Sequence, residues 1–202
     1  MVDIILKRVD LICKLFVEAA MKTDARVRYT KMALKNALLE LMETKPMNKI
    51  TVKEICERAQ LNRATFYKHY SDCYELLESI ENDIFKKFAE SIKNYVRAVD
   101  VTDLVSSLYD IINDNEKVCR TLIFNQRGAA LVGRMIAYAH DISVTEWGRK
   151  FKRATVDEIE LLYLCLSNGL FRAVVEGYDK FGKDEIIHFV DRVFKSVSSA
   201  FI

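Results

Sequence analysis

The chain has 202 residues, half of them apolar and 30% charged, with a net charge of +2 at pH 7, which is ordinary for a soluble globular protein. One proline and six glycines leave few turn-forming residues, so we expect long helices joined by short connections. Five cysteines without a CxxC pair argue against a disulfide framework and are typical of a reduced, cytoplasmic protein. Three scattered histidines give no metal-ligand spacing, so we expect no metal and no cofactor.

Residues 1–21 are predicted to form an extra amphipathic helix, because Ile5, Val9, Ile12 and Phe16 recur at helical spacing. Charged residues interrupt every apolar run before it reaches the length of a signal-peptide core or a membrane span. Three acids balance three bases in this segment, which disfavours an anionic lipid surface. We therefore expect no membrane partner.

The charge is unevenly distributed along the chain. Residues 22–70 hold eleven lysines and arginines against five acids, a net charge of +6. Residues 1–21 sum to zero, so the remainder of the chain carries a net charge of −4. A basic block ahead of a neutral-to-acidic body indicates a polyanion-binding module followed by a different domain.

Two short capped helices are expected within this basic block, after a first helix that ends just before Pro46. In "ITVKEICERA", Thr51 and Glu54 form a capping-box pattern that begins a helix of roughly eight residues. In "LNRATFYKHY", Asn62 is a good N-cap, and Leu61 and Phe66 have hydrophobic-staple spacing. The connection between them is about three residues long, which predicts a helix-turn-helix.

Helical periodicity orients the second of these helices, placing Phe66 and Tyr70 toward the core. The exposed side then carries a small residue, a hydroxyl, a phenol and two cations. Its members are Arg63, Ala64, Thr65, Tyr67 and Lys68. Arg and Lys suit phosphates or guanine edges, and a small residue lets the backbone approach closely. This surface is suited to a DNA groove.

The rest of the chain is also predicted to be helical. A long helix capped by Ser71 should extend to about residue 99. Further helices are expected at about 101–113, 115–124, 129–151, 155–178 and 183–201. No Ser/His/Asp order, phosphate-binding glycine loop or metal-ligand cluster is present in the sequence, so we do not expect an enzyme. The predicted fold class is all-α.

The segment "ITVKEICERAQLNRATFYKHYSD" resembles the N-terminal DNA-binding domain of TetR/AcrR-family transcriptional regulators. The similarity covers residues 26–80 and is most specific at 51–59 and 65–70. It implies a three-helix DNA-binding domain at residues 22–72 and a helical effector-binding and dimerisation domain at 73–202. By this resemblance, Thr51 and Tyr67 would contact phosphates, and Arg63, Ala64, Thr65 and Lys68 would face the major groove. Arg28, with Arg26 and Lys31, would lie near the DNA backbone.

Two positions depart from the family pattern. Gln60 stands in the turn where the family commonly has glycine, so we expect a strained turn, at roughly 1 kcal/mol for a residue with positive φ. Cys73 stands where the family often has a lysine, so one phosphate contact should be missing.

The effector and the dimer interface are less visible in the sequence. Large side chains on the middle helices are the effector-pocket candidates: Tyr109, Phe124, Met135, Tyr138, Trp147 and Tyr163. In the family the last two long helices usually pair across a two-fold axis, which makes the apolar stripes on those helices the candidates for a homodimer interface. Its expected members are Leu166, Leu170, Val190, Val193, Phe194 and Val197.

The favoured hypothesis is a dimeric repressor that a small-molecule effector releases from a palindromic site on double-stranded DNA. An activator or accessory regulator of the same fold remains open, because nothing in the sequence separates the two. A helical adaptor that does not bind DNA is disfavoured by the two cations and the absence of an acid at residues 63–68.

Overall fold

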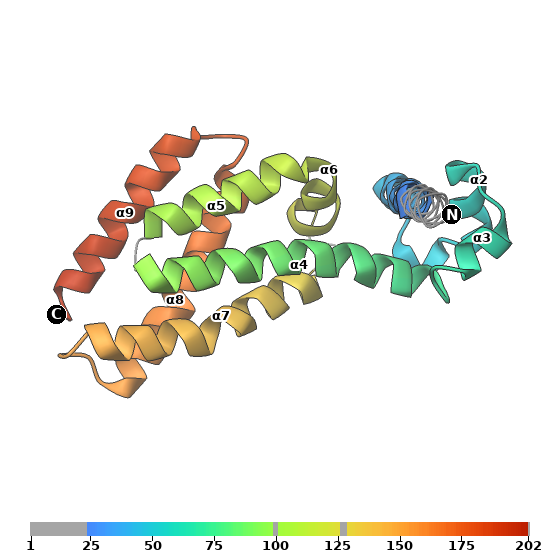
Figure 1. The fold of residues 1–202 in the computed structure, drawn as a ribbon. Coiled ribbons are helices and arrows are strands. Elements are labelled where there is room, and N and C mark those ends of the chain that lie inside the picture. The colour runs from blue at the N-terminus through green and yellow to red at the C-terminus, as the bar shows by residue number, and fades with distance from the viewer. Residues whose placement is uncertain (1–23, 99–100, 126–128, 202) are drawn as a thin grey trace, which may run out of the picture. The chain divides into compact units, whose positions relative to one another are not determined.

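The computed structural model describes residues 24–98, 101–125 and 129–201, so the helix predicted at residues 1–21 lies outside the described part. All regular structure in the described ranges is helical and none of it is a strand, which confirms the predicted all-α fold class (Figure 1). No helix within those ranges is both long enough and apolar enough to cross a membrane.

Contacts divide the chain into two compact units, Met1–Glu78 and Ser79–Ile202. The helix α4 (Cys73–Ala98) contributes residues to both. The boundary predicted at residue 72 coincides with the residue before α4, and as a boundary between functional domains it stays a prediction.

The N-terminal unit consists of one long helix and several short helical segments around one core. Residues 24–44 form its first described helix, and the single turn η1 (Met47–Lys49) follows Pro46. The helices α2 (Val52–Ala59) and α3 (Arg63–Tyr67) come next and pack against each other. Its core contains side chains that are completely buried: Leu34, Leu38, Ile55 and Phe66. Their helical spacing explains why each helix turns one apolar face inward.

The C-terminal unit is built from longer helices. After α4 these are α5 (Val101–Asp114), α6 (Glu116–Cys119), the π-helical turn η2 (Arg120–Phe124), α7 (Ala129–Lys150), α8 (Val156–Gly177) and α9 (Lys183–Ser199). The predicted ranges agree with these elements, except that the segment expected at 115–124 is divided between α6 and η2. The closest packing joins α5 with α9 and α7 with α8 (Figure 1).

The start of α4 differs from the prediction. Oδ1 of Asp72 accepts hydrogen bonds from the backbone N–H groups of Tyr74 and Glu75, at 2.8 and 2.9 Å. Asp72 is therefore the N-cap, and the expectation that Ser71 caps this helix is wrong. The backbone N–H of Ser71 instead donates to the Glu75 carboxylate at 2.5 Å. Two candidate caps stand side by side in the sequence, and the backbone direction decides which carboxylate or hydroxyl faces the free amides.

Candidate functional site

The first helix of the helix-turn-helix begins with the predicted capping box. Thr51 Oγ1 accepts from the Glu54 N–H at 3.3 Å. Glu54 Oε2 in turn accepts from the N–H and the hydroxyl of Thr51, at 3.0 and 2.9 Å. Lys45 also binds the Glu54 carboxylate, and Lys45 together with Thr51 lowers the pKa of Glu54 to about 2. Both donors of Thr51 are thus directed at Glu54, so a phosphate contact from Thr51 requires one of them to turn away from this carboxylate.

The turn between α2 and α3 adopts the expected strained conformation. Gln60 has φ 56° and ψ 40°, and it is the only non-glycine residue with positive φ among the described residues. The N–H of Gln60 donates to the carbonyls of Cys56 and Glu57, and the N–H of Leu61 donates to the carbonyl of Cys56 at 2.9 Å. These bonds satisfy the last carbonyls of α2 and reverse the chain within two residues.

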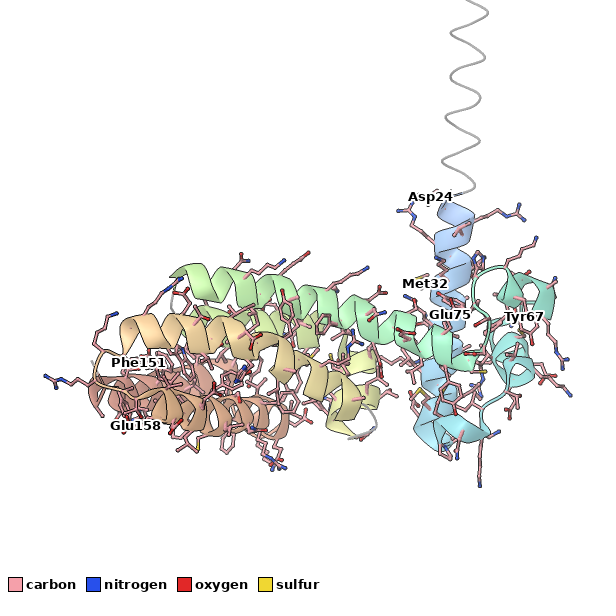
Figure 2. All side chains as sticks on the ribbon, turned by 90° about the horizontal axis from the view of Figure 1, so that it is seen from below. Asp24, Met32, Tyr67, Glu75, Phe151 and Glu158 are labelled. Atoms are coloured by element: carbon pink, nitrogen blue, oxygen red, sulfur yellow. The ribbon has the colours of Figure 1, made fainter. Side chains whose placement is uncertain are left out.

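Asn62 fixes the start of α3. Its Oδ1 accepts from the N–H of Thr65 at 2.7 Å and from the Thr65 hydroxyl at 2.9 Å. Phe66 is completely buried and Tyr70 is 5% exposed, as helical periodicity predicted. Tyr67 of α3 is open to solvent, at 57% exposure (Figure 2). The cap and the two buried rings therefore hold the outer face of α3 in one orientation.

This outer face carries three of the predicted residues on the helix itself, Arg63, Ala64 and Tyr67, together with Lys68 at its C-terminal end, and all four are exposed. Thr65 is half-buried and its hydroxyl proton is directed at Asn62, which leaves its methyl group and an acceptor lone pair for a partner.

The predicted basic segment lies on the first described helix. Arg28 is exposed, and its Nε lies 3.7 Å from Asp24 Oδ2. Arg26 and Lys31 on the same helix are also exposed. An ion pair as open to solvent as that of Arg28 contributes little to stability, so Arg28 can exchange Asp24 for another anion at small cost.

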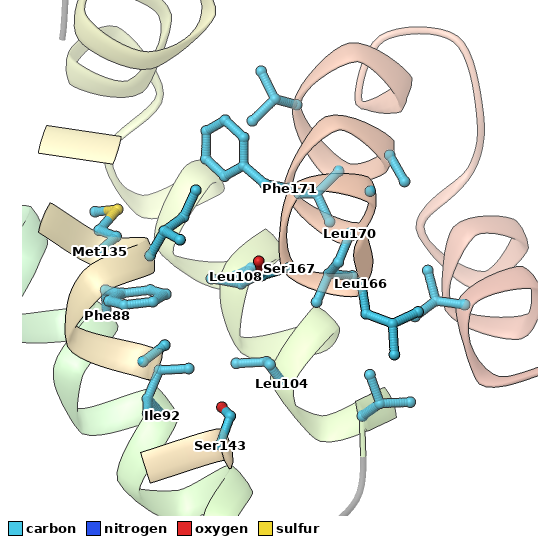
Figure 3. Close-up of a pocket in the computed structure, with 18 of the residues that line it drawn as sticks. Phe88, Ile92, Leu104, Leu108, Met135, Ser143, Leu166, Ser167, Leu170 and Phe171 are labelled. Carbon is cyan, nitrogen blue, oxygen red and sulfur yellow. The ribbon is translucent and has the colours of Figure 1, made fainter. Parts of the chain in front are cut away.

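The C-terminal unit contains an apolar cavity of about 370 Å³, lined from α4, α5, α7, α8 and α9 (Figure 3). Of the predicted pocket residues, Met135, Trp147 and Tyr163 line it. The other three candidates, Tyr109, Phe124 and Tyr138, lie outside the lining. Tyr109 and Phe124 both contact Tyr178, and Tyr138 contacts Phe85, all with 5.4 Å between ring centroids.

Sequence reasoning missed most of the lining. Aliphatic side chains such as Leu104 and Leu108 dominate it, together with Phe171 and the two serines Ser143 and Ser167 (Figure 3). Leucines at helical spacing look the same whether they fill a core or border a cavity, so no sequence signal distinguishes them.

The predicted dimer residues are directed mostly toward this cavity. Val190 and Phe194 are buried within the single chain. Leu166, Leu170 and Val193 are half-buried and line the cavity, as do Val190 and Phe194, whereas Val197 is half-buried outside the lining. Different apolar side chains stay open to solvent on these helices: Leu161 at 60%, Leu164 at 54% and Phe189 at 53% exposure.

Metal ligands do not gather in the described ranges, where no three His, Cys, Asp or Glu side chains are placed to hold a metal ion. His140 instead contacts two carboxylates, with Nδ1 2.8 Å from Asp141 Oδ1 and Nε2 2.8 Å from Glu160 Oε2. Asp141 and Glu160 raise the pKa of His140.

Comparison with known proteins identifies the N-terminal unit. Residues 35–80 match the family model of the bacterial regulatory proteins of the tetR family. A segment of 71 residues is 28% identical to YxbF of Bacillus subtilis, described as an uncharacterized helix-turn-helix-type transcriptional regulator. That segment spans 35% of this chain and 19% of YxbF.

Two solved structures share the fold over most of the chain. A transcriptional regulator of the TetR/AcrR type from Aquifex aeolicus is similar with a TM-score of 0.63 and 18% identity, over 83% of this chain and 99% of its own. A protein from Syntrophomonas wolfei, described as a TetR-family transcriptional regulator, is similar with a TM-score of 0.59 and 16% identity, over 87% and 97% of the two chains. The helix-turn-helix of this chain is therefore similar to that of the bacterial regulatory proteins of the tetR family, and its helical fold is shared with the two solved structures.

Proposed function

We propose that this protein is a cytoplasmic, sequence-specific DNA-binding transcriptional regulator. The observation that carries the proposal is the outer face of α3, where Arg63, Ala64, Tyr67 and Lys68 are exposed next to a doubly capped turn. No acid interrupts this face. A rigid, cationic face with a small residue near its centre fits the major groove, where backbone phosphates and base edges are both within reach.

The roles of the individual residues follow from their chemistry. Arg63 and Lys68 bind phosphates or guanine edges, and Tyr67 donates its hydroxyl to a phosphate. Thr65 offers its methyl group to a thymine methyl, because its hydroxyl proton is directed at Asn62. Arg28, on the first described helix, adds a contact to the sugar-phosphate backbone of the DNA. Thr51 reaches a phosphate only when one of its donors leaves Glu54.

The protein acts as a homodimer in this proposal. Leu161, Leu164 and Phe189 leave apolar surface on α8 and α9 exposed, which a second copy would cover. Half-buried side chains on the same two helices would add to this contact surface: Leu166, Leu170, Val193 and Val197. A two-fold dimer carries two copies of α3, so the DNA site is a palindrome with half-sites about one helical turn apart, or a multiple of that spacing.

The regulator is a repressor whose DNA affinity a small molecule lowers. The apolar cavity in the C-terminal unit supports a ligand site there. The ligand acts as a switch if it binds the DNA-competent and the released conformations with different affinity.

In vitro selection of bound fragments from a random DNA pool tests the proposal. We expect an enriched palindromic site, and we expect Lys68→Ala to bind it more weakly than the wild type. Lys152→Ala is the matched control, because Lys152 is an exposed lysine of the C-terminal unit and its replacement changes the net charge equally. Recovery of no enriched sequence would leave the fold without DNA-binding activity, as the adaptor alternative requires. Transcription in vitro from the selected site separates a repressor from an activator.

A further inference from the structure

The cavity of the C-terminal unit is unusual in the uniformity of its lining. Among the described residues that line it, none carries a charged side chain. Aliphatic and aromatic groups form nearly the whole wall (Figure 3). An ion placed in such a wall loses its hydration without gaining a partner, whereas an apolar molecule gains from leaving water.

Few polar groups are left for a ligand in this wall. The Tyr163 hydroxyl donates to the backbone carbonyl of Ile136 and is thereby engaged. Burial raises the pKa of Tyr163 to about 12, so this phenol stays neutral over the physiological pH range. Tyr163 therefore contributes an apolar ring surface to the cavity.

Two serines line the cavity, Ser143 and Ser167, and of the two only Ser167 has a buried hydroxyl without a partner among the described residues. The hydroxyl lies near enough to the Tyr163 phenol to favour the charged form of that phenol slightly, but no hydrogen bond of ordinary distance and angle joins the two. The Ser167 hydroxyl points toward the cavity, which Leu108 of α5 also lines (Figure 3). A buried hydroxyl without a partner is costly, and a ligand group that pairs with it removes this cost.

We propose that the cavity binds an uncharged, predominantly apolar small molecule whose single hydrogen-bonding group meets Ser167. A molecule of this kind is the effector of the regulator. This assignment rests on the proposed function. The cavity volume of about 370 Å³ lies toward the lower end of the range for small-molecule sites, which suits a compact ring system or a short branched chain.

Three aromatic probes of nearly equal size test this proposal by isothermal titration calorimetry on the full-length chain. 1-Naphthamide is neutral and can hydrogen-bond, 1-naphthoate has nearly the same shape with a negative charge, and naphthalene has no polar group. We expect 1-naphthamide to bind at least about ten-fold more tightly than 1-naphthoate, because the anion has no partner in the wall. Equal or tighter binding of 1-naphthoate overturns the proposal, and so does a failure of both probes to bind.

Two substitutions locate the bound probe. Ser167→Ala should weaken 1-naphthamide by about five-fold and leave naphthalene unchanged, because only the amide loses a hydrogen bond. Leu108→Trp should weaken both neutral probes by about ten-fold by filling the cavity, with Leu108→Phe as the milder variant if the tryptophan disturbs folding. Val156→Trp is the matched control, because Val156 is 73% exposed and lies outside the lining. If Leu108→Phe folds and binds all probes as the wild type does, the assigned cavity is wrong.

The selected DNA separates this proposal from the function on which it rests. If the probes bind as expected and no DNA sequence is enriched, the cavity assignment stands and the DNA-binding function fails. If DNA is enriched and 1-naphthoate binds as well as 1-naphthamide, the function stands and the ligand class is wrong.

Discussion

The guanidinium of Arg120 donates from Nη1 and Nη2 to the two carboxylate oxygens of Asp179, at 2.9 and 2.8 Å. Arg120 begins the π-helical turn η2, and Asp179 follows the end of α8, 59 residues later. The same guanidinium lies over the rings of Phe124 and Tyr178, 5.6 and 5.8 Å from their centroids. This pair raises the pKa of Arg120 and lowers that of Asp179, so both stay charged at neutral pH. Arg120 thus joins the π-helical turn η2 to the segment between α8 and α9.

Replacing Arg120 should loosen this connection. We expect Arg120→Ala to lower the melting temperature measured by circular dichroism, and Arg120→Lys to lower it less, because lysine keeps the charge but loses the two-pronged geometry. Arg172→Ala is the control, since Arg172 pairs with Glu176 one turn along the same helix α8, and both side chains are exposed. Equal melting temperatures for Arg120→Ala and Arg172→Ala would show that the connection to Asp179 adds nothing.

The capping box of α2 predicts a stability change in acid. The pKa of Glu54 is lowered to about 2 by Lys45 and Thr51, from a usual value of 4.5. A lowered pKa stabilises the fold above the unfolded value, so this contribution is lost as the pH falls from about 4.5 to about 2. Melts recorded across this window should show a smaller loss of stability with acid for Glu54→Gln than for the wild type. Glu57→Gln, the same exchange in the same helix, should follow the wild type, and a Glu54→Gln profile parallel to the wild type would contradict the prediction.

The two carboxylates around His140 lead us to expect the opposite pH dependence of stability, at higher pH. Asp141 and Glu160 raise its pKa above the usual 6.5. A raised pKa stabilises the fold below the unfolded value, and the contribution disappears as the pH rises through the higher, folded value. An NMR titration should place the His140 midpoint above 6.5, and both Asp141→Asn and Glu160→Gln should lower it. A midpoint at or below 6.5 in the wild type would show that these contacts do not persist in solution.

The left-handed Gln60 predicts a stabilising substitution. Glycine adopts φ 56° without the steric cost of a side chain, which is roughly 1–2 kcal/mol, but it loses about 0.5–1 kcal/mol through its flexibility in the unfolded chain. We therefore expect Gln60→Gly to raise the free energy of unfolding by up to about 1 kcal/mol in urea denaturation. Gln60→Ala keeps the steric cost and should bring no gain. A destabilised Gln60→Gly would mean that the Gln60 side chain contributes more than its strain costs.

The outer face of α3 predicts two kinds of binding defect, measured by fluorescence anisotropy on selected and mismatched DNA. Lys68→Ala and Thr65→Ala should relax the preference for the selected sequence, because their partners are base edges. Tyr67→Phe should weaken binding to all sequences alike, by about 1 kcal/mol for one lost hydrogen bond to a phosphate. Wild-type binding by all three variants would remove α3 from the DNA interface.

The helix-turn-helix shows how much of the structure can be predicted from residues close together in the sequence. The capping box at Thr51, the cap at Asn62 and the inward face of Phe66 were all predicted, because each depends on residues within four positions of one another. The strain at Gln60 was expected from the family resemblance, because the family commonly has glycine at this position of the turn. The cap of α4 was misassigned to Ser71, since Asp72 offers an equally good group one residue later.

The sequence by itself therefore determined the all-α class, the order and approximate bounds of the helices, and the exposed face of α3. Tertiary structure decided which apolar stripes of α8 and α9 face inward, why Met135 borders the cavity and Tyr138 does not, and that Ser167 is left without a partner. The physical reason is the separation in sequence of the residues that interact. Caps and helix faces depend on neighbours along the chain, whereas a cavity and an unpaired hydroxyl depend on how helices far apart in the sequence pack together.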